Sequence, residues 1–237
     1  MASDRTGRRR ILLMRHGHVD YFAQQAAGGD PRDVELTPEG REQAAAAAEA
    51  LSEIDFDLAV SSGLPRTRQT AEIVLAAHSS PPALSEEPEL EEIRGGWADA
   101  NSRAELAARL AYAFEVAAEP GATFLDGGEP FSEVYARVSG ALERLLTHGS
   151  WRRALVVAHE GVNRVAMGWA CGGGLGAIGA FEQDLACVNV LDFDLTPRPD
   201  GEGLQIERRI IKAVNVTPYD YLKHGMARTS LEALFDL

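Results

Sequence analysis

Three short apolar runs in this chain each end abruptly in polar, chemically reactive residues. The runs and the residues after them are 11–14 before Arg15-His16-Gly17, 56–60 before Ser61-Ser62, and 154–158 before His159. Apart from Asp57, these runs are continuously apolar, as is typical of strands that are buried on both faces of a parallel sheet. Because parallel strands end at the same edge of a sheet, and ligands bind beyond that edge, we expect the reactive residues to meet there.

Segments of helical character alternate with these runs. Thr37-Pro38 is a helix start signal, since threonine caps a helix and proline suits its first position. Further helices are expected at 41–51, 66–77, 102–118, 132–147, 162–169 and 229–237, and further strands at 188–193 and 204–216. The alternation predicts an α/β fold, a three-layer sandwich with a mostly parallel central sheet flanked by helices.

The length of 237 residues suits one α/β domain. We expect this domain to span 10–237, after a flexible N-terminal end at 1–9. Residues 20–35 are polar and glycine-rich and are expected to form a surface loop. Proline and glycine punctuate the middle of the chain, where a helical insertion is expected at about 98–150.

Composition limits the partners and the cell compartment. The chain has 23 Lys and Arg against 36 Asp and Glu, a net charge of −13, which repels nucleic acid and anionic membrane surfaces. No run is apolar enough for a membrane span or a signal peptide. Two cysteines form neither a disulfide framework nor a zinc site, so we expect a cytoplasmic protein without a metal.

Arginines gather where the apolar runs end. Arg15 adjoins His16, and Arg66 lies just after Ser61-Ser62. The guanidinium group suits phosphate because two parallel N–H donors match two phosphate oxygens. An otherwise acidic chain therefore carries a local basic cluster that fits a small phosphorylated ligand or inorganic phosphate.

Five motifs in order resemble the histidine phosphatase superfamily, whose members are also called phosphoglycerate mutase-like. They span residues 10 to about 193, and five ordered motifs are far more specific than Arg-His-Gly alone. The motifs are Arg15-His16-Gly17, the capped helix start at 36–44, Ser61-Ser62 with Arg66 and Gln69-Thr70-Ala71, Leu90-Glu91-Glu92-Ile93, and Val156-Val157-Ala158-His159.

The resemblance implies a role for each matching residue. His16 would be the nucleophile that accepts the phosphoryl group, and Arg15, Arg66 and His159 would bind its oxygens. Glu92 would protonate the leaving group and then activate water. No metal or cofactor is implied. Four other glutamates crowd the same segment, so a neighbour of Glu92 stays open as the proton donor.

The chain departs from the family at three positions. The family usually has Gln or Glu and then Thr or Ser after Arg-His-Gly, where this chain has His18-Val19. Glu160 stands where a glycine is common after the second histidine. Candidates for the substrate pocket are His18, Tyr21, Phe22, Arg94 and Glu160, each of which could instead be a surface or packing residue. The loop at 20–35, the insertion at about 98–150 and the segment 217–224 are expected to shape this pocket.

These features favour a metal-independent phosphatase that hydrolyses a small phosphorylated metabolite through a phosphohistidine on His16. A cofactor-dependent phosphoglycerate mutase and a catalytically weak phosphate-ligand-binding protein of the same fold are the alternatives. The natural substrate stays open. The glycine-rich segment 172–179 fits an intrachain turn better than packing against another chain, so a homodimer also stays open.

Overall fold

A six-stranded sheet forms the centre of the computed structural model, which describes residues 7–26, 28–96, 105, 109–110 and 112–234. The strands lie in the order β3-β2-β4-β1-β5-β6, with β5 antiparallel to both neighbours and the first four strands parallel to one another. Their bounds are β1 Gly7–Arg15, β2 Leu58–Ser61, β3 Leu84–Glu86, β4 Arg153–Ala158, β5 Val188–Pro197 and β6 Leu204–Val216. The sheet is therefore mixed but mostly parallel, as predicted.

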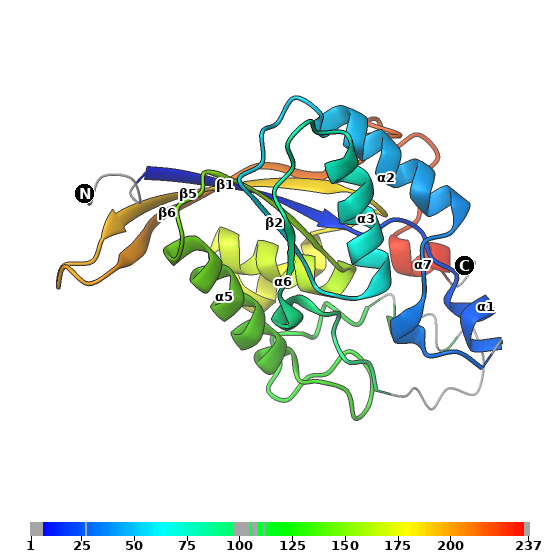
Figure 1. Ribbon diagram of the computed structural model, residues 1–237. Coiled ribbons are helices and arrows are strands. Elements are labelled where there is room, and N and C mark those ends of the chain that lie inside the picture. Colours follow the sequence, from blue (N-terminus) through cyan, green and yellow to red (C-terminus); the bar gives the residue numbers. More distant parts are fainter. Residues whose placement is uncertain (1–6, 27, 97–104, 106–108, 111, 235–237) are drawn as a thin grey trace.

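Helices cover both faces of the sheet (Figure 1). α2 (Pro38–Leu51) and α3 (Pro65–Ala76) lie on one face, and α5 (Phe131–Thr147) and α6 (Glu160–Cys171) lie on the other. β1 shows why, because its alternate side chains enter two separate cores. Ile11 and Leu13 pack with α5 and α6, whereas Leu12 and Met14 pack with α2 and α3. The three-layer α/β sandwich is confirmed.

Short elements connect the layers. They are α1 Tyr21–Ala26, η1 Pro31–Asp33, η2 Pro88–Leu90, η3 Gly174–Ala180 and α7 Ser230–Leu234. α1 and η1 lie inside the segment expected to be a loop, and β3 was not predicted. Within the described part of the chain, no helix has the length and apolar character needed to cross a membrane.

The start of α2 packs tightly against the loop that follows β1. The Thr37 side chain caps the helix by accepting from the Gly40 amide at 3.1 Å. A Cβ atom on Gly40 would collide with the His18 carbonyl oxygen, so only glycine permits this approach. The contact brings the first turns of α2 beside His16, at the carboxyl end of β1.

The N-terminal boundary differs from its prediction. Gly7 to Arg9 belong to β1, and Arg9 is only 2% exposed, so a flexible end reaching residue 9 is wrong for these three residues. Residues 1–6 lie outside the described part. The long-range pairing of β1 with β5, from Gly7 opposite Leu195 onward, extends the strand beyond its apolar run.

The middle of the chain also differs. α5 confirms the predicted helix at 132–147, but it packs directly on α6 and the sheet and so belongs to a main layer rather than to an insertion. Residues 112–118 form turns where a helix was predicted, and 97–104, with most of 105–111, lie outside the described residues. Gly172 to Gly179 follows the intrachain alternative, since η3 packs against Gly168 of α6.

Candidate active site

The two candidate histidines meet at the carboxyl edge of the sheet. His16 follows β1 and His159 follows β4, and these strands are parallel neighbours, with Arg15 in register with Ala158. The two ring centroids are 5.2 Å apart with an interplanar angle of 66°. The side chains are almost fully buried, at 2% and 0% exposure.

Hydrogen bonding defines the free nitrogen of His16. Its Nδ1 lies 2.7 Å from the Gly17 carbonyl oxygen, which can only accept, so Nδ1 carries the hydrogen. A neutral ring then keeps a lone pair on Nε2. Burial, followed by the positive charges of Arg66 and Arg15, lowers the pKa of His16 well below its usual value. The ring is therefore a neutral imidazole at pH 7, the form that a nucleophile requires.

A chain of hydroxyl groups orients His159. Thr67 Oγ1 donates to the Leu64 carbonyl, Ser62 Oγ lies 2.9 Å from Thr67 Oγ1, and His159 Nε2 lies 2.8 Å from Ser62 Oγ. Because each hydroxyl has one hydrogen, the chain runs one way and His159 Nε2 donates to Ser62. Burial and then Arg66 lower the pKa of His159 too. Its Nδ1 faces no hydrogen-bond partner among the described residues.

Two arginines complete the cluster. Arg66, in the first turn of α3, is 4% exposed, and its guanidinium lies 5.6 Å from the centre of the Tyr21 ring. Arg15 lies at the end of β1, where its Nη2 is 3.1 Å from Glu160 Oε2. The Nε atoms of both arginines are buried without a hydrogen-bond partner in the described part of the chain.

Buried nitrogens without partners are uncommon because leaving one unpaired is energetically costly. Here three of them, Arg15 Nε, Arg66 Nε and His159 Nδ1, belong to the residues that the sequence predicted to bind a phosphoryl group. They come from β1, α3 and the end of β4. A tetrahedral anion could accept hydrogen bonds from both arginine Nε atoms, and from His159 Nδ1 once that ring takes up a proton.

The Glu92 side chain contacts the first turn of α6, the helix that begins directly after His159. Its carboxylate accepts from the Gly161 amide at 3.2 Å, from the Val162 amide at 3.3 Å and from its own neighbour Ile93 at 2.9 Å. A Cβ on Gly161 would lie 2.8 Å from Glu92 Oε1, so this glycine makes room for the carboxylate. Of the crowded glutamates, Glu92 is the one bonded to the start of α6.

Comparison with known proteins agrees with this geometry. The family model of the histidine phosphatase superfamily (branch 1) matches residues 11–198. The chain belongs to this superfamily. The resemblance predicted from the five motifs is thereby confirmed.

Curated relatives in the superfamily include several phosphatases. The chain is 29% identical over 218 residues to a probable 2-carboxy-D-arabinitol-1-phosphatase of Arabidopsis thaliana, covering 92% of this chain and 44% of that protein. The Triticum aestivum 2-carboxy-D-arabinitol-1-phosphatase is 30% identical, with 89% and 41% covered. This chain thus spans less than half the length of these two plant proteins. Glucosyl-3-phosphoglycerate phosphatase of Mycolicibacterium vanbaalenii is 33% identical over 65% of this chain and 70% of its own length.

Solved structures share the fold. A protein described as mycobacterial hydrolase 2 is 25% identical with a TM-score of 0.69, covering 96% of this chain and 95% of that one. Mycobacterial glucosyl-3-phosphoglycerate phosphatase in complex with VO3 is also 25% identical, with a TM-score of 0.64 and coverage of 87% and 98%.

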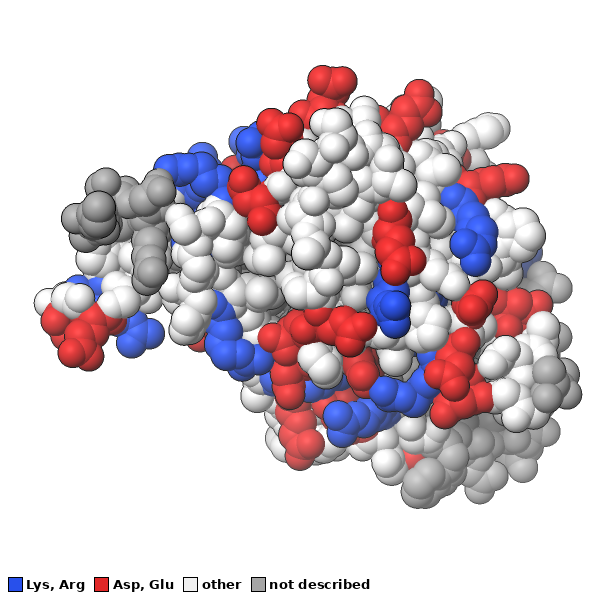
Figure 2. Space-filling model, viewed as in Figure 1, with Lys and Arg blue, Asp and Glu red and all other residues white. Residues whose placement is uncertain are grey.

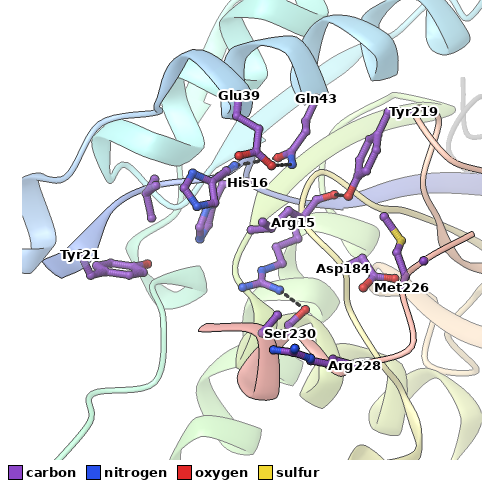
Figure 3. Close-up of a pocket in the computed structure, with 15 residues that line it drawn as sticks. Arg15, His16, Tyr21, Glu39, Gln43, Asp184, Tyr219, Met226, Arg228 and Ser230 are labelled. Carbon is purple, nitrogen blue, oxygen red and sulfur yellow. Dashed lines mark hydrogen bonds between the residues drawn. The ribbon is translucent and has the colours of Figure 1, made fainter. Parts of the chain in front are cut away.

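A pocket of about 560 Å³ opens beside His16 in this member of the superfamily (Figure 3). Two of the predicted pocket residues, His18 and Tyr21, line it together with Arg15. His18 also has a structural role, because its Nδ1 lies 2.8 Å from the Thr37 hydroxyl that caps α2. Val19, which lacks the family's usual hydroxyl, lines the pocket and packs in a small buried cluster with Val34 and Leu36.

Three other predicted pocket residues do not line this pocket. Phe22 is 52% exposed, and Arg94 is exposed with its backbone amide bonded to Glu129. Glu160 is 5% exposed and is paired with Arg15 and Arg164. Glu160 therefore contacts Arg15 without lining the pocket.

Most of the pocket lining was not predicted from the sequence. Figure 3 shows Glu39 and Gln43 of α2 on one side, with side chains from the last third of the chain on the other. The unpredicted residues are Glu39, Gln43, Asp184, Leu185, Tyr219, Gly225, Met226, Arg228, Ser230 and Ala233. The only signal was the expected role of 217–224 in shaping the pocket, and of these residues Tyr219 lines it. The expected insertion at about 98–150 contributes no lining residue in its described part.

The surface does not share the basic character of the site. Figure 2 shows acidic and basic side chains intermixed over one face. Exposed cations pair with carboxylates at the surface, as in Arg8 with Asp194 at 2.8 Å and Arg109 with Asp126 at 2.7 Å. At −13 overall, the molecule offers phosphate no long-range attraction, so an anion would depend on short-range contacts in the pocket.

Proposed function

We propose that the protein is a phosphomonoesterase that hydrolyses a small phosphorylated metabolite through a phosphohistidine on His16, without a metal. The observation that carries this proposal is the set of three unpartnered buried nitrogens around the paired histidines. They form a site whose hydrogen-bonding capacity is unmet until an anion binds. Family membership and the named phosphatases among the relatives support the same chemistry.

The first step uses the lone pair on His16 Nε2. The nitrogen attacks phosphorus in line with the ester oxygen, a P–N bond forms, and the P–O bond to the alcohol breaks. Arg15, Arg66 and His159 stabilise the charge on the three transferred oxygens. Glu92, in its acid form, gives its proton to the departing alkoxide. His159 would gain a proton as the phosphoryl dianion binds, because that negative charge opposes the effect of burial on its pKa.

The second step returns the enzyme to its starting state. The Glu92 carboxylate removes a proton from water, the resulting hydroxide attacks phosphorus, and the P–N bond breaks to release phosphate. Glu92 is again protonated, His16 is neutral, and His159 loses its extra proton as phosphate leaves, so protons and electrons balance over the cycle. A pocket of about 560 Å³ has the size of a small-metabolite site, which supports a small alcohol as the leaving group.

The test measures phosphate release by the purified protein from p-nitrophenyl phosphate and a panel of metabolite phosphates, with vanadate as inhibitor. We expect turnover without added metal, inhibition by vanadate, and a ³²P label on His16 after rapid quench. Isomerisation of 3-phosphoglycerate with a trace of bisphosphate, without phosphate release, would instead support the mutase. Phosphate binding with no label on His16 would support the binding protein.

We also propose a cytoplasmic location. Cys171 and Cys187 are both free thiols, as is usual in a reducing compartment. Imaging of a fluorescent fusion tests the location. Size-exclusion chromatography with light scattering tests whether two copies associate.

A further inference from the structure

Arg15 is held by groups from three separate parts of the chain. Its Nη1 donates to the Gln183 carbonyl and to Ser230 Oγ, at 2.5 and 2.7 Å, and its Nη2 lies 3.1 Å from Glu160 Oε2. Both hydrogens of Nη1 are therefore used. What remains is Nε, which is buried and without a hydrogen-bond partner among the described residues, beside Nη2, which forms the ion pair with Glu160.

The Nε and Nη2 atoms form the edge through which arginine can donate hydrogen bonds to two oxygens at once. Two other arginines of β1 use this edge. Arg10 donates from Nε and Nη2 to the two carboxylate oxygens of Asp192 at 2.7 and 2.9 Å, and Arg8 grips Asp194 in the same way at 2.8 and 3.0 Å. In Arg15 the Nη1 atom is bonded to the protein and Nη2 contacts Glu160, so the buried Nε on this edge is the atom left available for a phosphate oxygen.

Glu160 is itself fixed in place. Its Oε1 accepts from Arg164 Nε and Nη2 at 3.3 and 3.0 Å, and Arg164 Nη2 also contacts Glu182. Arg164 is 3% exposed and Glu160 is 5% exposed, so the carboxylate lies between the buried guanidinium of Arg164 and that of Arg15, whose side chain is 12% exposed. A buried charge of this kind is costly unless paired on each side, and its removal would leave Arg15 without its ionic anchor.

We infer that Glu160 is a positioning residue for Arg15: it anchors the guanidinium so that Nε faces the phosphoryl group. This inference rests on the proposed phosphatase function. It explains why a long acidic side chain can occupy a position where the superfamily often has glycine, since the carboxylate contacts arginines and does not line the pocket.

The test compares E160Q with the matched variant D192N. Asp192 is also a buried carboxylate that forms an ion pair with an arginine of β1. Its partner is Arg10, five residues before Arg15, so D192N removes a similar ion pair without changing the contacts of Arg15. In E160Q we expect kcat/KM for p-nitrophenyl phosphate to fall by about 10- to 100-fold, mainly through KM, with a similar rise in the vanadate Ki. In D192N both constants should stay within about twofold of wild type, whatever happens to its melting temperature.

A double-mutant cycle separates positioning from general loosening. In an R15K background, which keeps the charge but lacks the fork, adding E160Q should change kcat/KM by less than about twofold. An equal loss in both backgrounds, an unchanged vanadate Ki in E160Q, or tighter vanadate binding there would each overturn the inference.

A second variant covers the case in which E160Q does not fold. E160D keeps the negative charge one methylene further from Arg15, and we expect a smaller rise in vanadate Ki in the same direction. Wild-type Ki and KM in E160D would also overturn the inference. If wild-type protein neither hydrolyses esters nor binds vanadate, the proposed function fails first, and that result is distinct from the failure of Glu160 alone.

Discussion

The proposed phosphate site and the outer wall of the pocket are built in contrasting ways. The phosphate site consists of Arg15, His16, Arg66 and His159, and the outer wall consists of the residues of 217–234 that line the pocket. His16 and His159 stand at the ends of adjacent buried strands, and Arg66 is in the first turn of a core helix. In the outer wall, turns surround one short helix and side chains such as Arg228 are exposed. The family match ends at residue 198, before this wall begins.

The contrast assigns different tasks to the two regions. A site on rigid strands holds reacting atoms with little motion, which any phosphate ester requires. A wall of turns tolerates substitution and suits the part of the substrate that differs between family members. Changes in the phosphate site should therefore affect all substrates alike, whereas changes in the wall should alter their ranking.

The largest effect is expected for H16A. Loss of the nucleophile should lower kcat for every phosphate ester by at least about 10³-fold. Phosphate release from p-nitrophenyl phosphate and glycerol phosphate measures it. H148A is the control, because His148 is exposed and its carbonyl oxygen is bonded to Arg9 near the start of β1, whereas His16 follows the end of that strand. Turnover by H16A at the wild-type rate would contradict the proposed phosphohistidine mechanism.

The next effect is expected for E92Q. Without its acid and base, the enzyme should lose about 10²- to 10³-fold in kcat for glycerol phosphate. Nitrophenolate leaves without a proton, so p-nitrophenyl phosphate should still give a burst followed by slow turnover, since water is no longer activated. Stopped-flow absorbance records the burst. The control is E89Q, whose exposed carboxylate belongs to the same segment; an equal loss in E89Q would contradict the assignment.

Acid should destabilise the free protein through the two buried histidines. Burial and nearby arginines lower the pKa of both His16 and His159, so below about pH 6.5 the unfolded chain binds protons that the folded state does not. The free energy of unfolding should thus fall with falling pH, by up to about 1.4 kcal/mol per histidine between pH 7.5 and 5.5. Urea denaturation of wild type and H159N measures this; an equally steep pH dependence in H159N would contradict it.

The smallest effect is expected in the outer wall. M226A enlarges the pocket away from the phosphate site and should change kcat/KM by a few-fold, by different factors for p-nitrophenyl phosphate and glycerol phosphate. Steady-state kinetics on both esters gives the ratio. A uniform loss on both would erase the distinction between the two regions.

Local patterns predicted most of the phosphate site. Each apolar run was long enough to be a buried strand, and the residue after each run had to emerge at the same edge of a parallel sheet. That reasoning brought His16 and His159 together, and the helix signal after Ser62 added Arg66. It could not predict β3, a strand of three residues with one half-buried and two exposed side chains, because so short an edge strand has no clear periodicity.

The sequence by itself determined the longer strands and helices, with the exception of 112–118, and the reactive residues at the strand ends, because these depend on near neighbours along the chain. Tertiary structure alone decided that β1 begins at Gly7, where it pairs with β5, and that Arg15 is anchored by Glu160, Gln183 and Ser230. It also decided which side chains of 217–234 face the pocket. These contacts join residues more than a hundred positions apart, and the packing of the whole sheet sets their distances.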